Sequence, residues 1–264
     1  MRRYFIVALG LVAMSSAPAT AADLSVPRAL PVMAAPPPPF SWTGCYLGGY
    51  VGGGWGSRDV TATDLNGYNG SDVWGYKLSP SFIGGGTLGC NYQTGQFVFG
   101  LEGEGGYLSL RGSALDPLSP FVPLDTTSST RIGDWYAMAT GRIGTTWDSA
   151  LFYVKGGAAF VNTQVSVIDP VLQPVLGNTI SATSTAQVRT TWTIGGGIEY
   201  AFAPNWSVKG EYMFIGLSQS ETVCGVAALN AGRYCWSHEE RGIHTAKIGL
   251  NYLFNTADPV VARY

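Results

Sequence analysis

Nine charged side chains recur at alternate positions of segments that are otherwise rich in apolar residues and glycine. They are Glu102, Glu104, Arg142, Lys155, Arg189, Glu199, Lys209, Glu211 and Lys247. Acids and bases gathered on one face could form an ion path or a proton-transfer site. They could also pair with one another, because an unpaired buried charge is very costly. The choice depends on the elements that hold these side chains.

The segments that carry the charges have a period of two, which is the period of a β-strand. From Phe97 to Tyr107, aromatic, leucine and glycine residues alternate with a second set that contains two glutamates. The pattern returns from Trp192 to Phe202 and from Trp206 to Phe214. It defines eight segments, at roughly 43–56, 79–92, 97–111, 133–147, 151–163, 188–202, 206–216 and 243–254. Each is long enough for a tilted strand that crosses a membrane.

The links between these segments alternate strictly between short and long. The residue types predict tight turns at Gln93 to Gln96, Asp148 to Ala150 and Ala203 to Asn205. The long links lie near 57–78, 112–132, 164–187 and 217–242. Membrane barrels have short periplasmic turns and long outer loops. The pattern therefore predicts an all-β fold, an eight-stranded antiparallel up-and-down transmembrane β-barrel.

The polarity of the two strand faces favours a membrane barrel over a soluble one. All nine charges lie opposite the aromatic face, and the aromatic residues concentrate at strand ends, as in interfacial girdles. These residues are Trp55, Phe97, Tyr107, Trp135, Trp147, Trp192, Phe202 and Trp206. We expect the aromatic face to contact lipid and the charges to plug a lumen too narrow for an open channel. A conductive or gated path through the charges is the alternative.

Both ends of the chain are expected to lie outside the barrel, which spans 41–254. Residues 1–21 resemble a signal peptide, with Arg2 and Arg3 before a short apolar run and a cleavage site at Ala19-Thr20-Ala21. Cleavage after Ala22 is the second choice. The proline-rich residues 22–40 predict an extended linker, either a plain tether or a spacer that reaches periplasmic partners. Residues 255–264 form a C-terminal tail.

Composition and motifs exclude several functions. A net charge of -2 leaves no basic stripe for nucleic acid. The run Gly84 to Gly89 matches a dinucleotide fingerprint, but no helix opens there, so we expect a crowded strand and no cofactor. His238 and His244 alone are poor evidence for a metal site, and we expect none. Ser237 and His238 would point to opposite sides of a strand, so we expect outer-loop polar residues and no enzyme.

Four cysteines in an exported chain indicate disulfides. Cys45 lies near the start of the first segment and Cys90 near the end of the second. Adjacent antiparallel strands place such positions at similar heights. Cys224 and Cys235 share the last long link. We therefore predict the pairs Cys45–Cys90 and Cys224–Cys235.

Several segments resemble the small alphaproteobacterial outer-membrane surface proteins, porin-family barrels with an OmpA/OmpX-like eight-stranded fold. Phe40 to Gly48 is similar to the first strand of that family, and Gln93 to Gly103 to its second turn and third strand. Trp192 to Glu211 is similar to its sixth and seventh strands. The resemblance implies a surface antigen that stabilises the envelope in the bacterial outer membrane, without shared enzymatic activity.

The last segment resembles the assembly signal of outer-membrane barrels, with Lys247 and Gly249 followed by the aromatic residues Tyr252 and Phe254. This implies recognition by the barrel-assembly machinery. The other expected partners are outer-membrane lipid and lipopolysaccharide, for a monomer or weak homo-oligomer. Three functions remain open: a plugged structural surface barrel, a narrow porin that passes small solutes, and an outer-leaflet lipid-modifying hydrolase.

Overall fold

The computed structural model describes residues 40–65, 72–116, 126–169, 180–217, 220–226 and 232–254. The expected signal peptide, residues 22–39 of the expected linker, and the C-terminal tail lie outside this part of the chain. The regular elements of the described residues are thirteen β-strands. Within the same ranges, no helix has the length and apolar character needed to cross a membrane.

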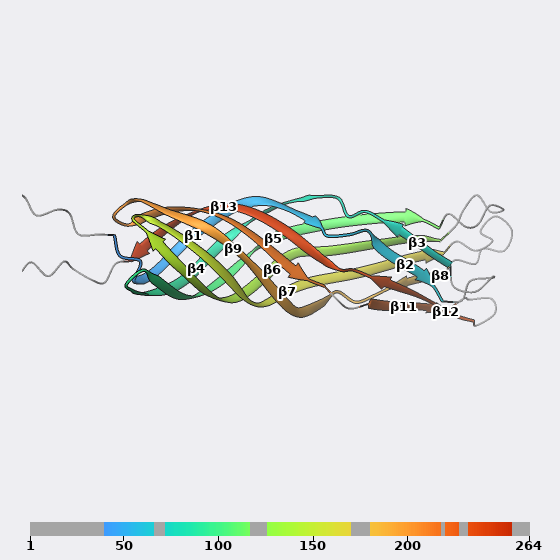
Figure 1. The fold of residues 1–264 in the computed structure, drawn as a ribbon. Helices are drawn as coiled ribbons and strands as arrows, with labels where there is room; N and C mark the ends of the chain where they lie inside the picture. Colours follow the sequence, from blue (N-terminus) through green and yellow to red (C-terminus); the bar gives the residue numbers. More distant parts are fainter. Residues whose placement is uncertain are drawn as a thin grey trace, which may run out of the picture. The chain divides into compact units, whose positions relative to one another are not determined.

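Eight of the strands form a closed antiparallel sheet (Figure 1). They are β1 (Gly44–Gly56), β4 (Ser81–Thr94), β5 (Phe97–Leu115), β6 (Thr127–Trp147), β7 (Ala150–Asp169), β9 (Gln187–Ala203), β10 (Trp206–Gly216) and β13 (Gly242–Phe254). Each strand pairs with its sequence neighbour in this series, and β1 pairs with β13 to close the barrel. The eight-stranded antiparallel barrel predicted from the sequence is confirmed.

The alternation of residue types determines which face of each strand is buried. On β10, Ser207, Lys209, Glu211 and Met213 are buried, whereas Trp206 and Tyr212 are exposed. The same alternation holds on β5 and β9, and all eight predicted girdle residues are exposed. The charged side chains therefore point into the barrel and the predicted girdle residues point out, as the period of two predicts.

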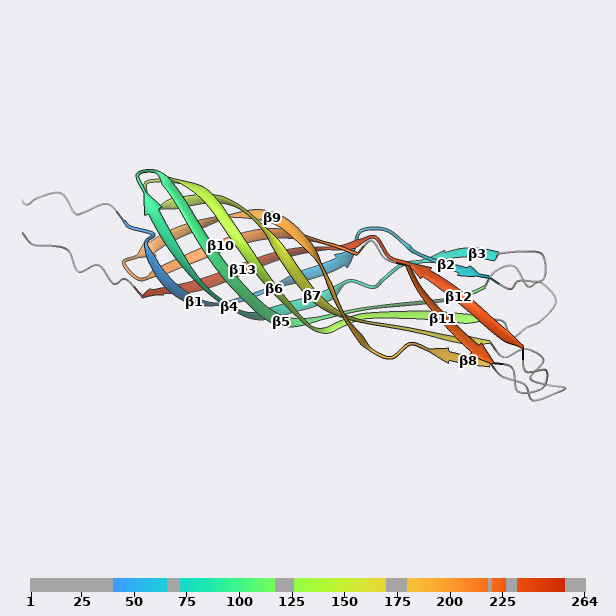
Figure 2. The same cartoon turned by 90° about the horizontal axis from the view of Figure 1, so that it is seen from below.

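Three tight turns join barrel strands at the end where β1 begins and β13 finishes (Figure 2). Thr94 is separated from Phe97, Trp147 from Ala150, and Ala203 from Trp206 by two residues each. Two of the turns contain residues with positive φ, Gly95 at 58° and Asp148 at 52°. Glycine and aspartate tolerate this conformation in two-residue hairpin turns, so the local sequence sets these connections.

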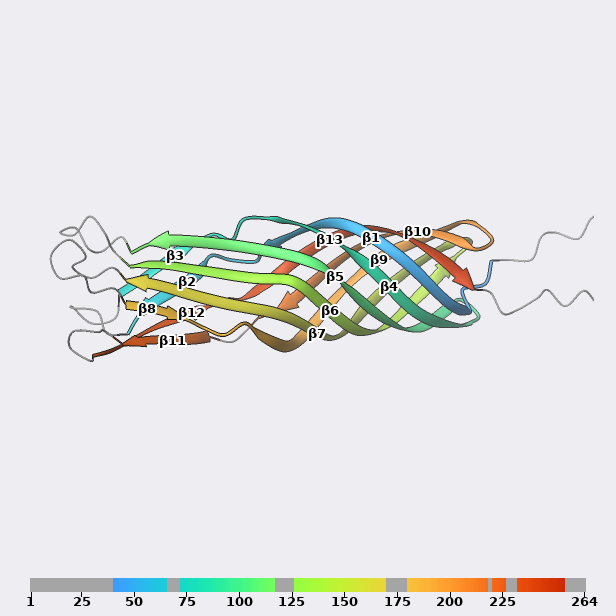
Figure 3. The same ribbon diagram turned by 180° about the vertical axis from the view of Figure 1, so that it is seen from behind.

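The long links are more structured than the sequence analysis expected. β5, β6 and β7 run on well past the barrel, and their extended ends lie side by side in Figure 3. The links also contain β2 (Val60–Asp64), β3 (Asp72–Tyr76), β8 (Ile180–Thr183), β11 (Ser220–Val226) and β12 (Arg233–Glu239). The described parts of the links therefore consist mostly of strands. Their alternating residues, such as Val165 and Val167, carried a signal too short to identify alone.

Four of these short strands form a second antiparallel sheet in the order β11-β12-β2-β3, and β8 pairs antiparallel with the outer end of β7. We call β2, β3, β8, β11, β12 and the extended ends of β5 to β7 the outer collar. Its core contains Trp74, Trp236, Val60 and Ile180, all buried. Cys224 and Cys235 lie directly opposite each other on β11 and β12 and form a disulfide. The collar is thus a packed β-structure with a covalent link.

Two adjacent glycines on β4, Gly85 and Gly86, differ in how closely the neighbouring strand approaches them. A methyl group at Gly85 would overlap the Gly105 carbonyl oxygen and lie 2.6 Å from the Gly106 Cα, whereas one at Gly86 would meet only the Gly48 carbonyl at 3.5 Å. We expect Gly85→Ala to lower the free energy of unfolding by about 1–3 kcal/mol, the usual cost of overpacking. Gly86→Ala is the control. Equal urea midpoints for the two variants in detergent micelles would contradict this packing.

Candidate functional site

Eight of the nine charged side chains singled out by their spacing meet inside the barrel. The four acids are Glu102 and Glu104 on β5, Glu199 on β9 and Glu211 on β10. The four bases are Arg142 on β6, Lys155 on β7, Lys209 on β10 and Lys247 on β13. All eight residues are buried, and the set is balanced in formal charge. We call these residues the lumen charge network.

The network is continuous, because several of its acids and bases each take part in more than one ion pair. Lys155 lies at the centre, with its Nζ 2.6 Å from Glu102 and 2.8 Å from Glu211. Lys247 joins Glu104 at 2.5 Å and Glu211 at 2.8 Å. Lys209 lies 3.3 Å from Glu102, and Arg142 connects Glu199 at 3.1 Å with Glu102 at 3.8 Å. Every buried charge of the network therefore has an opposite charge within contact distance.

Three tyrosine hydroxyls add hydrogen bonds to carboxylates of the network, a role that was not predicted from the sequence. Tyr46 donates to Glu102 at 2.5 Å, Tyr136 to Glu104 at 2.6 Å and Tyr153 to Glu211 at 2.9 Å. Glu199 accepts from Ser207 and Asn251. The sequence contains a signal for two of them. Tyr136 and Tyr153 directly follow outward-facing aromatic residues, and successive side chains of a strand point to opposite faces, so both tyrosines must face inward.

Apolar side chains fill the lumen on both sides of the network. On β5, the inward positions run in order from Val98 through the two glutamates to Leu108. Val98 belongs to a buried cluster at the turn end with Trp42 and Leu151, and Leu108 to a larger cluster toward the outer collar. Trp42, which precedes β1, is fully buried. The charges are therefore sandwiched between two apolar layers.

Arg189 does not join the network, contrary to the expectation from its spacing. Its guanidinium contacts the Glu221 carboxylate at 2.6 Å and the Thr163 hydroxyl at 2.9 Å, in the outer collar. Arg189 lies on the same face of β9 as Glu199, but it is ten residues away along the strand. That separation is about 33 Å along a β-strand. The alternation of side chains along a strand identifies the face on which a residue lies, but it does not give the height of that residue in the barrel.

Three of the acids, Glu102, Glu104 and Glu211, bring oxygens within 4.8 Å of one another, close enough to suggest a cation site. The Lys155 ammonium contacts all three carboxylates, and Lys247 contacts two of them. These ammonium groups stand where a metal ion would have to bind. The cluster is therefore explained by its lysine counter-ions.

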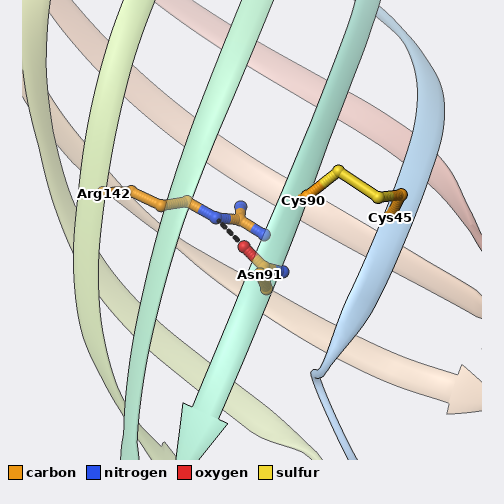
Figure 4. Close-up of a disulfide and its surroundings, with 4 residues drawn as sticks. All are labelled: Cys45, Cys90, Asn91 and Arg142. Carbon is orange, nitrogen blue, oxygen red and sulfur yellow. Dashed lines mark hydrogen bonds between the residues drawn. A yellow bond between two sulfur atoms is a disulfide. The ribbon is translucent and has the colours of Figure 1, made fainter. Parts of the chain in front are cut away.

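The disulfide Cys45–Cys90 lies on the outer face of the barrel, near the turn end (Figure 4). The two cysteines are directly opposite in the β1–β4 register, which is the pairing that the strand positions predict. The next residue, Asn91, points inward and accepts a 2.8 Å hydrogen bond from Arg142. The disulfide and the charge network therefore occupy opposite faces of the same part of the sheet.

Neither histidine lies in an exposed loop tip. His238 is buried in β12, and neither ring nitrogen has a hydrogen-bond partner among the described residues. His244 is on the outer face of β13, where its Nδ1 lies 2.5 Å from the Tyr212 hydroxyl and its ring stacks with Trp55. The expectation of loop-tip residues was wrong for His238, because the last long link folds into a sheet. No serine activation is visible at either ring in the described residues.

Comparison with known protein families identifies the architecture. Residues 7–254 match the family described as "Outer membrane protein beta-barrel domain". The chain belongs to this family. Outer-membrane barrels cross the bilayer with strands that present apolar side chains to lipid, which explains the exposed aromatic and aliphatic face described above.

The chain is similar to outer-membrane proteins of Brucella over nearly its whole length. It is 29% identical to the "31 kDa outer-membrane immunogenic protein" of Brucella melitensis, covering 94% of this chain and 99% of the relative. The Brucella suis protein of the same name matches to the same extent. Among solved structures, OprG of Pseudomonas aeruginosa matches 82% of this chain and 99% of its own, with 11% identity and a TM-score of 0.49.

The short turns give the orientation of the barrel in the outer membrane. Short turns of such barrels face the periplasm, so the chain enters β1 and leaves β13 on the periplasmic side. The outer collar therefore lies on the extracellular side. The barrel is a protein of the outer membrane with a balanced, buried charge network at its centre and a folded β-structure outside the cell.

We expect Glu102→Gln to destabilise the barrel strongly. Glu102 contacts Lys155, Lys209 and Arg142, so neutralising it leaves an excess of buried positive charge. Breaking a buried ion pair in this way costs about 3–5 kcal/mol. Urea unfolding in detergent micelles, followed by tryptophan fluorescence, measures the loss. Glu239→Gln, which alters an exposed pair with Arg241, is the control. A loss no larger than that of the control would contradict this role.

Two groups of the outer collar give it opposing pH dependences. Burial raises the pKa of the Glu240 carboxyl to about 7, and burial lowers the pKa of the His238 imidazole to about 4. Glu240 therefore contributes stability that is lost as pH rises from about 4.5 to about 7. His238 contributes stability that is lost as pH falls from about 6.5 to about 4. The two trends offset each other between these limits.

Removing one group should expose the trend of the other. We expect the collar of Glu240→Gln to become more stable as pH rises from 4 to 6.5, and that of His238→Phe to become less stable as pH rises from 4.5 to 7. Hydrogen exchange of β11 and β12, corrected for the intrinsic effect of pH and read by mass spectrometry, measures both. Parallel profiles for the two variants would exclude this assignment.

Proposed function

We propose that this protein is a closed structural barrel that supports envelope integrity and presents its outer collar at the cell surface. The observation that carries the proposal is the filling of the lumen. A continuous network of eight charges lies between two apolar layers, and the balanced pairing leaves no charge free to attract a solute. An eight-stranded barrel has room for such side chains but not for an open channel as well.

The outer collar supports the surface role in this proposal. Its sheet buries Trp74 and Trp236 and carries the disulfide Cys224–Cys235. A packed, cross-linked structure offers the environment a defined shape, which suits a surface antigen. The two Brucella relatives are named outer-membrane immunogenic proteins, and the collar is the part of this chain that we propose to be presented in the same way.

The partners in this proposal follow from the two ends of the barrel and from its outer face. The exposed apolar side chains contact outer-membrane lipid and lipopolysaccharide. The last strand, in which Tyr252 and Phe254 face outward and Lys247 and Gly249 face inward, is read by the barrel-assembly machinery. The protein acts as a monomer or weak homo-oligomer, needs no cofactor and catalyses no reaction.

Planar-bilayer recording separates this function from that of a narrow porin. We expect the refolded wild-type protein to give no stable open conductance. The double variant Glu104→Ala/Lys247→Ala removes a buried ion pair of 2.5 Å without changing the net charge. It should open a water-filled gap in the charge layer and make brief openings more frequent than in the wild type, although the apolar layers on both sides remain.

The matched control is Glu239→Ala/Arg241→Ala, which removes an exposed ion pair of 3.2 Å from the outer collar. It should remain as closed as the wild type. A stable conductance from the folded wild-type monomer would refute the closed barrel and favour the porin.

A further inference from the structure

The outer wall of the collar contains a polar hollow just beyond the membrane-facing belt. It has a volume of about 650 Å³ and is formed by the extended ends of β5, β6 and β7 together with β8 and Lys77. Three cations line it, Lys77, Arg111 and Arg131, and none of its lining residues in the described part of the chain is a carboxylate. We call it the collar hollow. Nothing in the proposed structural function requires a cationic recess at this place.

Two of the cations are held in an unfavourable arrangement. Arg111 on β5 and Arg131 on β6 are directly opposite in the strand register. Like charges at such positions repel each other. A bulge in β6 at Gly133 and Asp134 brings one carboxylate to both guanidinium groups. With Lys77, three positive charges face one negative charge, which leaves an excess of two for an external anion.

Hydroxyl groups lie directly beside the two arginines. Ser113, Ser129, Ser166 and Thr183 follow one another in register across β5, β6, β7 and β8. On β5 and β6 this row lies two residues further out than the two arginines, so the serines and the arginines share the outer face. Ser129 already donates to the Ser166 carbonyl, and the Ser166 and Thr183 hydroxyls share one hydrogen bond, which leaves Ser113 and one hydroxyl of that pair as donors. Guanidinium groups bind phosphate through paired charge-assisted hydrogen bonds, and these two hydroxyls supply further donors. The combination fits a phosphate group attached to a sugar.

The height of the hollow indicates the source of that phosphate. Arg111 lies four residues beyond the girdle residue Tyr107, and Arg131 lies four residues beyond Trp135. Four residues span about 13 Å along a strand, and roughly 10 Å along the membrane normal once strand tilt is included. The polar headgroup region begins within a few ångströms of the hydrocarbon edge and extends over about this distance.

We propose that the collar hollow binds the phosphate of a glycolipid headgroup in the outer leaflet. Only a lipid seated in the leaflet can place acyl chains on the apolar belt beside Tyr107 and Trp135 while its phosphate reaches Arg111 and Arg131. The site holds the barrel in a shell of phosphorylated lipid, and it adds a specific contact to the structural role. The inference does not depend on a closed lumen.

Titration of the full chain, folded in detergent micelles, with bisphosphorylated lipid A tests this site. We expect Arg111→Gln/Arg131→Gln to bind at least about fivefold more weakly than the wild type, because two charge-assisted contacts are lost. Fully dephosphorylated lipid A should bind the wild type no more tightly than intact lipid A binds this variant. Lys77→Gln, which leaves both arginine contacts to Asp134 intact, should show a smaller but measurable loss.

The matched control is Arg233→Gln/Arg241→Gln, which removes the same number of positive charges from exposed positions elsewhere on the extracellular side. Its affinity should stay within about twofold of the wild type, because distant exposed charges are screened. The shift of each folded variant on an unheated gel shows that the barrel has formed. If the double arginine variant does not fold, Lys77→Gln and the lipid A comparison decide the question.

Three results would overturn the proposal: an equal loss in the control, a loss below fivefold in the double arginine variant, or equal binding of dephosphorylated lipid A. If inorganic phosphate displaces lipid A at equal phosphate concentration, the hollow takes soluble anions and the lipid assignment is wrong. Conductance of the same preparations is a separate readout. A porin would fail the closed-barrel test without altering the affinity for lipid A.

Discussion

The pairing of β1 with β13 is the interaction on which the rest of the structure depends. Inside a bilayer no water can satisfy an unpaired backbone group, so a sheet can cross only if its first and last strands join. Twelve consecutive residue pairs, from Cys45 with Phe254 to Gly56 with Ile243, make this seam. Closure with eight strands then sets a narrow lumen, and a narrow lumen must be filled with side chains.

The filling of the lumen follows from that geometry. Some inward positions carry glycine, where backbones approach closely, and the others carry apolar side chains in two layers with the charged side chains between them. Charges are tolerated there only as a balanced set with hydrogen bonds to every carboxylate, because desolvation is otherwise too costly. The tyrosine hydroxyls of Tyr46, Tyr136 and Tyr153 meet this condition for three of the four acids. The polar centre is therefore a structural consequence of closure as much as a functional device.

The extracellular end is not subject to the requirement that the sheet be closed. Beyond the membrane, water can satisfy free strand edges, so β5 to β7 extend without a closed ring and a separate four-stranded sheet packs over them. Its core is held by tryptophans and a disulfide. The outer wall is free to become polar there, and the collar hollow appears where the apolar belt stops. Function at the surface can vary in this region without disturbing the barrel.

The sequence by itself determined the eight barrel strands, their faces, the tight turns and both disulfide pairs. These depend on a period of two and on neighbours along the chain, which local residue types encode. Only the tertiary structure decided which charges lie at the same height in the barrel. Arg189 was therefore predicted to belong to the network but does not, and three tyrosines belong to it although they were not predicted. Only tertiary structure also showed the outer sheet, because β2 pairs with β12 across most of the chain. Strand tilt and long-range pairing set these features, and neither is written in local sequence.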